Sequence, residues 1–355
     1  MSSCERFSPY RDPSGSRLRG ARFPARLALL LVLATMALTG PVPAEDRPAT
    51  DRTLESRLTP IIKAHKGTVA VAVKHLRTGE TFRYRADEVM PTASLIKFPV
   101  MVEAYRQAEA GQVDLDARAT LHDRDKVPGS GILTSHFSDG STFRLRDAVR
   151  LMIAFSDNTA TNLVLDAIGL GATAATMEQM GYPNTKIHSK VFRRDTSVFP
   201  ERSKRYGLGS TTADEMIRLC EQLHDRNLVS RKASEAMLEH LRACDDDEKF
   251  PRFLPAGTKI AFKTGSLADT RTAAGIIECP AGPVAVCVLS HSNEDHRWVP
   301  DNAGNVLCAE IARAVFDHYN KPAEPSPSRA AGRADPARAS RPAGGTADTK
   351  TTPRS

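Results

Sequence analysis

Three short strings in a fixed order constrain this chain more than any other feature: Ser94-Leu95-Ile96-Lys97, Ser156-Asp157-Asn158 and Lys263-Thr264-Gly265. Together they supply a hydroxyl nucleophile, two ammonium groups, a second hydroxyl and an amide, which are the parts of a serine acyl-transfer site. Taken alone, each string also fits a structural role, as a helix start, a helix cap or a strand end. The three together, each in a matching helix or strand context, indicate one catalytic site.

Strand patterns at both ends of the central region enclose a block of helical patterns. Apolar and β-branched residues predict strands near residues 68–73, 80–84, 259–263, 272–278 and 284–290. Apolar residues at three- and four-residue spacings predict helices over residues 91–110, 145–154, 160–168, 172–180, 212–223, 233–241 and 305–319. This order indicates an α+β fold in which an all-α subdomain, about residues 112–250, is inserted into a sheet-forming chain.

The three strings resemble those of the penicillin-recognising serine hydrolases, and of class A β-lactamases in particular, from about Leu54 to Tyr319. The resemblance implies a five-stranded antiparallel sheet with flanking terminal helices beside the α subdomain. The segments 129–133 and 210–212 resemble a loop bordering the family's cleft and the end of its Ω-loop. The function implied is β-lactam hydrolysis through an acyl-enzyme. A D,D-peptidase acting on D-Ala-D-Ala ends and a non-hydrolysing β-lactam-binding protein are the alternatives.

Residue chemistry and this resemblance together assign roles within the site. Ser94 is the expected nucleophile, and Lys97, one helical turn away, is its expected base. Burial and the nearby charge of Lys263 are expected to lower the pKa of Lys97. The resemblance implies that Ser156 passes a proton to the leaving nitrogen and that the N–H groups of Ser94 and Ser266 bind the oxyanion. The expected substrate-binding residues are Asn158, Lys263, Thr264, Gly265, Ser266 and Arg271.

The chain departs from the class A pattern between residues 181 and 209. The resembling family places an Arg-x-Glu-x-x-x-Asn string there, and its glutamate activates the water that removes the acyl group. Counting forward from residue 181 puts the glutamate position near Val191, and counting back from residue 210 puts it near Thr196. Neither residue is acidic. The only acids of this segment, Asp195 and Glu201, are therefore the candidate deacylation bases.

Both ends of the chain differ in composition from the catalytic region. An arginine-rich segment, the apolar run 27–38 and Val42-Pro43-Ala44 together predict a signal peptide over residues 1–44. Residues 321–355 are rich in Pro, Ala and Arg and predict a disordered tail. We therefore expect an exported, periplasmic or extracellular catalytic domain at residues 45–320. It is expected to be monomeric, with no stable membrane span after processing.

Charge and cysteine content restrict the partners. The formal charge of +7 is carried mainly by the two ends, so the near-neutral region 45–320 argues against binding of nucleic acid. Cysteine and histidine spacings suit no metal site, so neither a metal nor another cofactor is expected. The expected ligand is a small-molecule β-lactam or a peptidoglycan stem peptide.

Five cysteines follow the predicted signal peptide, at positions 220, 244, 279, 287 and 308. Because the number is odd, at least one of them stays free or pairs between chains. Cys220 and Cys244 are a candidate disulfide pair if the exported protein meets an oxidising compartment.

Overall fold

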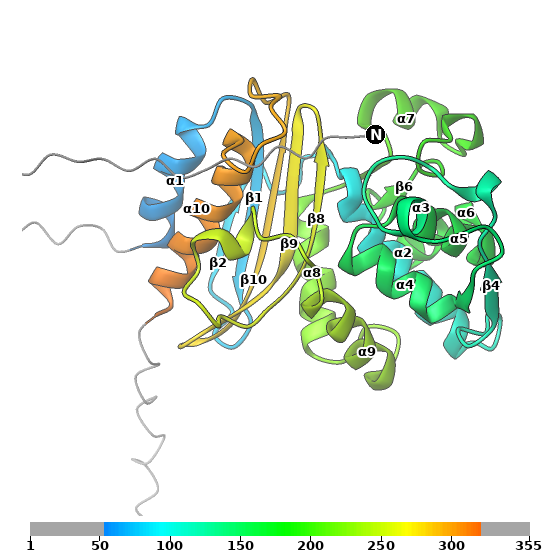
Figure 1. Cartoon of the computed structure of the whole chain (residues 1–355). Helices are drawn as coiled ribbons and strands as arrows, with labels where there is room; N and C mark the ends of the chain where they lie inside the picture. Colours follow the sequence, from blue (N-terminus) through cyan, green and yellow to red (C-terminus); the bar gives the residue numbers. More distant parts are fainter. Residues whose placement is uncertain (1–52, 321–355) are drawn as a thin grey trace, which may run out of the picture. The chain divides into compact units, whose positions relative to one another are not determined.

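The computed structural model describes residues 53–320. The predicted signal peptide and the predicted C-terminal tail lie outside the described residues. Within them, helices and a sheet form the predicted α+β arrangement, so the predicted fold class is confirmed (Figure 1).

A five-stranded antiparallel sheet forms one half of the structure, with the strand order β2-β1-β10-β9-β8. Its strands are β1 (Thr68–His75), β2 (Thr81–Tyr84), β8 (Ile260–Leu267), β9 (Thr270–Cys279) and β10 (Gly282–His291). Strands from the two ends of the chain meet where β1 pairs with β10. Because β8 is the last strand in this order, one of its edges pairs with no other strand of this sheet and faces the helical half of the protein.

The sheet is buried on both faces, because side chains alternate along each strand. In β1, Val69, Val71 and Val73 belong to a hydrophobic cluster shared with helices α1 (Leu54–Ala64) and α10 (Ala303–His318). The intervening Ala70 and Ala72 belong to a second cluster, shared with the helical subdomain. Figure 1 shows α1 and α10 on one side of the sheet and the other helices on the opposite side.

The inserted subdomain contains the predicted block of helices. Its helices are α2 (Lys97–Glu109), α3 (Leu133–His136), α4 (Leu145–Ala154), α5 (Asn158–Ile168), α6 (Leu170–Gln179), α7 (Pro200–Tyr206), α8 (Ala213–His224) and α9 (Arg231–Arg242). Two small sheets accompany them, β3-β7-β6 (Met90–Pro91, Gly209–Thr211 and Lys186–Ile187) and β4-β5 (Arg118–Thr120 and Thr142–Arg144).

The predicted helix over 91–110 begins later than expected. Residues Met90–Pro91 form a short strand, and a 3₁₀ turn (Ala93–Ile96) precedes the first residue of α2. The short helix α7 lies in a segment whose charged residues gave no clear apolar spacing.

The candidate disulfide between Cys220 and Cys244 is not formed, and all five cysteines of the described region are free thiols. Cys220 packs within the core cluster on the helical side of the sheet, where burial raises its pKa to about 12. Cys244 follows α9 and lies at the edge of a cavity described below. None of the helices between residues 53 and 320 has the length and apolar character needed to cross a bilayer.

Candidate active site

Ser94 lies in the 3₁₀ turn that leads into α2, on the wall of a cavity of about 800 Å³. The preceding residue, Ala93, holds a left-handed backbone with φ of 47°, an unfavourable conformation for a residue with a side chain. Backbone strain of this kind persists mainly where function requires it. Among the described residues, the Ser94 hydroxyl has no hydrogen-bond partner, so it is free to meet a ligand in the cavity.

Lys97 lies fully buried beneath this wall, as the first residue of α2. Its Nζ donates to Asn158 Oδ1 (2.8 Å), to Ser156 Oγ (3.3 Å) and to the Ser156 carbonyl oxygen. Burial, and secondarily the charge of Lys263, hold the pKa of Lys97 well below its ordinary value. A lysine in this environment gives up its proton more readily than a solvated one, which suits the role of base that its position after Ser94 predicted.

The Ser156-Asp157-Asn158 string joins α4 to α5 and performs two tasks at once. Asp157 points away from the cavity, because its carboxylate caps α5 through the Ala160 N–H (2.8 Å). The same carboxylate accepts the N–H groups of Ile132 and Leu133, which fixes the neighbouring loop. The helix-cap reading of this string is therefore correct for Asp157, while Ser156 and Asn158 are left to face the cavity.

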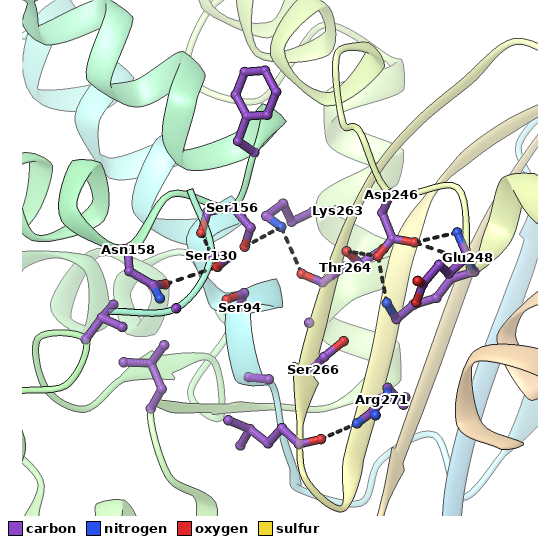
Figure 2. A pocket seen from close by; sticks show the side chains of 18 of the residues that line it. Ser94, Ser130, Ser156, Asn158, Asp246, Glu248, Lys263, Thr264, Ser266 and Arg271 are labelled. Carbon is purple, nitrogen blue, oxygen red and sulfur yellow. Dashed lines mark hydrogen bonds and ion pairs between the residues drawn. The ribbon is translucent and has the colours of Figure 1, made fainter. Parts of the chain in front are cut away.

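Ser156 bridges the two lysines of the site. Lys263 Nζ donates to its hydroxyl oxygen at 3.1 Å (Figure 2). Lys97 Nζ lies 3.3 Å from the same oxygen. Its backbone φ of 53° is again left-handed. Ser130, from the loop that resembled a cleft border, donates to the Ser156 carbonyl oxygen (2.7 Å). A hydroxyl between two lysine side chains can receive a proton from one of them and pass its own proton to another group in the cavity.

The Lys263-Thr264-Gly265 string forms the middle of β8, the strand beside Ser94. A Cβ at Gly265 would lie 2.8 Å from the Ser94 backbone nitrogen and 2.4 Å from the Thr92 carbonyl oxygen. Only glycine therefore lets this strand approach the nucleophile so closely. Lys263 is fully buried, and that burial lowers its pKa. Ser266 follows on the same strand and lines the cavity.

Thr264 has a partner that the sequence reading did not identify. Its hydroxyl donates to Asp246 Oδ2 (2.8 Å), and the same oxygen accepts from Lys249 Nζ at 2.6 Å (Figure 2). The Asp246 carboxylate also accepts the backbone N–H groups of residues 248 and 249. The signal that could have revealed this pair is the charged run 245–249 just ahead of β8.

Arg271 lines the cavity from β9, opposite Ser266 in the strand register. It is almost fully buried, and its Nη atoms donate to the carbonyl oxygens of residues 267, 270 and 297. The guanidinium also stacks on Trp298, 4.9 Å from the ring centre. Arg271 is thus in the cavity wall where a substrate carboxylate was expected, and it also clamps the loops at that end of the sheet.

The loop of residues 181–209 presents no carboxylate to the cavity. Its lining residues are Ser189, Lys190, Val191, Phe192, Arg194, Gly207 and Leu208. Val191 is held at both its N–H and its carbonyl by the side chain of Asn162 (2.8 and 3.1 Å). Its position agrees with the forward count for the missing glutamate.

Neither candidate deacylation base lies in the cavity wall. Asp195 pairs with Arg193 and Glu201 pairs with Lys204, and their side chains are 66% and 83% exposed. The expectation that one of them replaces the glutamate is therefore not supported by their placement. A sequence count could not exclude them, because it does not show which way a loop side chain points.

Comparison with known proteins places this site in a family. The family model described as the β-lactamase enzyme family matches residues 53–319, about three quarters of the chain. The chain belongs to this family. A β-lactamase of Streptomyces fradiae is 29% identical over 297 residues, covering 80% of this chain and 91% of the relative.

Solved structures agree with that membership. The crystal structure of a β-lactamase from Sphaerobacter thermophilus is 31% identical, with a TM-score of 0.66, and covers 74% of this chain and 97% of its own. PBP-A, at 24% identity and a TM-score of 0.64, covers 74% of this chain and 94% of its own and shares the fold. The site is thus that of a serine hydrolase of the β-lactamase family, with an apolar residue at the loop position next to the cavity.

Proposed function

We propose that this protein hydrolyses β-lactam amides through a covalent acyl-enzyme on Ser94. The observation that carries the proposal is the pair of buried lysines, Lys97 and Lys263, joined through the Ser156 hydroxyl, together with a free Ser94 hydroxyl in the cavity wall. The family membership and the similarity to β-lactamases support it.

Acylation follows from this geometry in three proton transfers. Neutral Lys97 takes the proton of Ser94, and the Ser94 oxygen forms a bond to the lactam carbonyl carbon. The resulting oxyanion is held by the N–H groups of Ser94 and Ser266, a type of interaction worth about 3 kcal/mol per donor. The C–N bond then breaks as Ser156 gives its proton to the leaving nitrogen, and Lys97 returns its proton to Ser156. Asn158 and the Lys263-Thr264 pair hold the amide and the carboxylate of the substrate.

The loop of residues 181–209 offers no carboxylate for deacylation, because Val191 lines the cavity at that place. We assign the activation of water to Lys97, the base already used in acylation, so we expect the acyl-enzyme to be long-lived for this family. The same observation favours a second candidate, a D,D-peptidase that cleaves D-Ala-D-Ala peptides and is trapped by β-lactams. A mutant of PBP-A was solved as an acyl-enzyme complex with penicillin G.

Intact-protein mass spectrometry over time tests both candidates. Residues 45–320 are mixed with benzylpenicillin and, separately, with a chromogenic cephalosporin. An adduct that forms and decays while substrate is consumed supports the β-lactamase. A persistent adduct supports the peptidase, to be followed by release of D-alanine from D-Ala-D-Ala peptides. No adduct with either compound contradicts the proposed acylation of Ser94.

We also propose that residues 1–44 direct export and are removed, which leaves a monomeric periplasmic or extracellular enzyme. The support is the composition of this segment, since it lies outside the described residues. N-terminal sequencing of the mature protein and its mass in solution test the cleavage site and the oligomeric state. A mature protein that begins before the apolar run would contradict the cleavage.

A further inference from the structure

Exposed apolar side chains gather around one cavity. Within residues 53–320, seven large hydrophobic side chains are exposed, and five of them line the active-site cavity. These five are Phe155, Phe192, Leu267, Trp298 and Val299. An apolar surface concentrated in this way marks a site for an apolar part of a ligand.

Phe192 is the least protected phenylalanine of this set, with 61% of its surface exposed. Its backbone is also strained, since φ is 57°, a region that bulky residues avoid. It occupies the third position of a turn closed by the Arg193 N–H and the Lys190 carbonyl oxygen (3.2 Å). Glycine or asparagine is favoured at a turn position with positive φ. The fold thus keeps a phenylalanine where neither burial nor backbone preference accounts for it.

The ring of Phe192 is placed close to the residue expected to hold the substrate amide. A Cβ built on Gly129 would lie 3.2 Å from Phe192 Cε2 and 2.6 Å from Asn158 Nδ2. Both atoms therefore border the small space that a side chain at position 129 would fill. The backbone of Val191, immediately before Phe192, is fixed by Asn162, so the turn that carries the ring is anchored.

We propose that Phe192 is a specificity-determining residue that binds the acyl side chain of the substrate and selects acyl donors in which that side chain is aromatic. An acyl group whose amide is bound by Asn158 projects its side chain beside that amide, next to the ring. Aromatic pairs at such contacts are stabilised beyond their buried area. Since this assignment depends on the proposed acylation of Ser94, the two are tested in one experiment with separate readouts.

The test compares benzylpenicillin with 6-aminopenicillanic acid, which has the same ring system and no acyl side chain. Second-order rate constants for acylation are measured by rapid quench and intact mass for the wild type, Phe192→Ala, Phe192→Gly and Phe253→Ala. Phe253 is the matched control, because it is an exposed phenylalanine that does not line the cavity. We expect the ratio of the two rate constants to fall roughly three- to tenfold in both Phe192 variants. The control should keep the wild-type ratio.

The glycine variant separates the ring from the strained backbone, because glycine adopts positive φ without penalty. We expect Phe192→Gly to melt at a higher temperature than Phe192→Ala while losing the same selectivity. A ratio that is unchanged or increased in both variants would overturn the assignment, and so would a loss confined to Phe192→Ala, which would point to loop distortion. Absence of acylation by either penicillin in the wild type overturns the proposed function itself, and this assignment with it.

Discussion

The two walls of the cavity around Ser94 are built from opposite kinds of side chain. On the acylation wall, the Ser156 hydroxyl oxygen joins Lys97 and Lys263, and both lysine side chains are buried. On the loop wall, Val191 and Phe192 present apolar side chains. The hydrogen bonds that Asn162 forms with Val191 involve the backbone of Val191 and not its side chain.

This difference shows which half of the chemistry can change without loss of the fold. Buried polar groups need all their hydrogen-bond partners, so the acylation wall tolerates few amino-acid substitutions. Asn162 binds the backbone of Val191 whatever its side chain, so the loop wall can exchange a carboxylate for an aliphatic group. The deacylation step is therefore the part of the mechanism that this scaffold can vary most freely.

Removing the nucleophile tests the acylation wall most severely. Ser94→Ala is expected to abolish covalent labelling by benzylpenicillin, because it removes the unpaired hydroxyl that lies in the cavity wall next to β8. The adduct is measured by intact mass. Ser135→Ala is the control, an exposed serine outside the cavity, and it should label like the wild type. Labelling that persists in Ser94→Ala would assign the nucleophile to another residue.

Removing the base is expected to slow acylation by roughly 10²–10⁴-fold, the usual contribution of a general base. Lys97→Met keeps the volume of the side chain, and the acylation rate constant measures the loss. A variant that acylates at the wild-type rate would exclude Lys97 as the base.

The pH dependence of acylation tests the cause of the lowered pKa. Because a base must be deprotonated, the wild-type rate should fall as pH falls through the pKa of Lys97. The charge of Lys263 helps to lower that pKa, so Lys263→Met should move the acid limb to higher pH as well as reduce the rate. An acid limb that stays in place would show that burial alone determines the pKa.

Adding a carboxylate to the loop wall is expected to give that wall the general base that it lacks. Val191→Glu should shorten the life of the benzylpenicillin acyl-enzyme by roughly 10²–10⁴-fold, because it supplies a second general base. The buried site should cost about 1–3 kcal/mol of folding stability. Val191→Gln is the matched control, with the same shape and no base. Equal lifetimes in the two variants would mean that position 191 does not reach the ester.

The contrast between the walls also explains what could be predicted from the sequence. Local spacing predicted Ser94 one turn before Lys97, the helix that follows Ser156 and the strand that carries Lys263, because these motifs lie in or next to regular elements. The partners of Thr264 and the direction of Asp195 could not be predicted, since they depend on contacts between a loop and a distant strand. The same holds for the strained turn at Phe192, because phenylalanine gives no local signal for positive φ.

The ion pair beside Thr264 is expected to stabilise the acylation wall rather than to react. Asp246→Ala leaves the buried ammonium of Lys249 without its partner, which should lower the free energy of unfolding by about 3–5 kcal/mol. Asp247→Ala is the control, because Asp247 is exposed and its carboxylate forms no ion pair within residues 53–320. Denaturant unfolding of the two variants measures the difference. Equal loss in both would mean that the pair contributes nothing specific.

The smallest expected effect concerns His188, which supports the loop wall through contacts with the Gly207 carbonyl oxygen and the Ser210 hydroxyl. Burial lowers its pKa from the ordinary 6.5 to about 4, and it does the same for His240 on α9. Because the unfolded chain binds these protons first, stability is lost as pH falls from about 6.5 to 4, by about 3 kcal/mol for each histidine.

His188→Gln and His240→Gln should each remove about half of this slope in denaturant unfolding measured at several pH values. Only His188→Gln should also alter the lifetime of the acyl-enzyme at low pH, because His188 supports the loop that faces the ester and His240 packs against Tyr105 on the far side of the subdomain. If both variants changed that lifetime equally, the two walls would be coupled through the whole helical subdomain, and the independence of the loop wall would be lost.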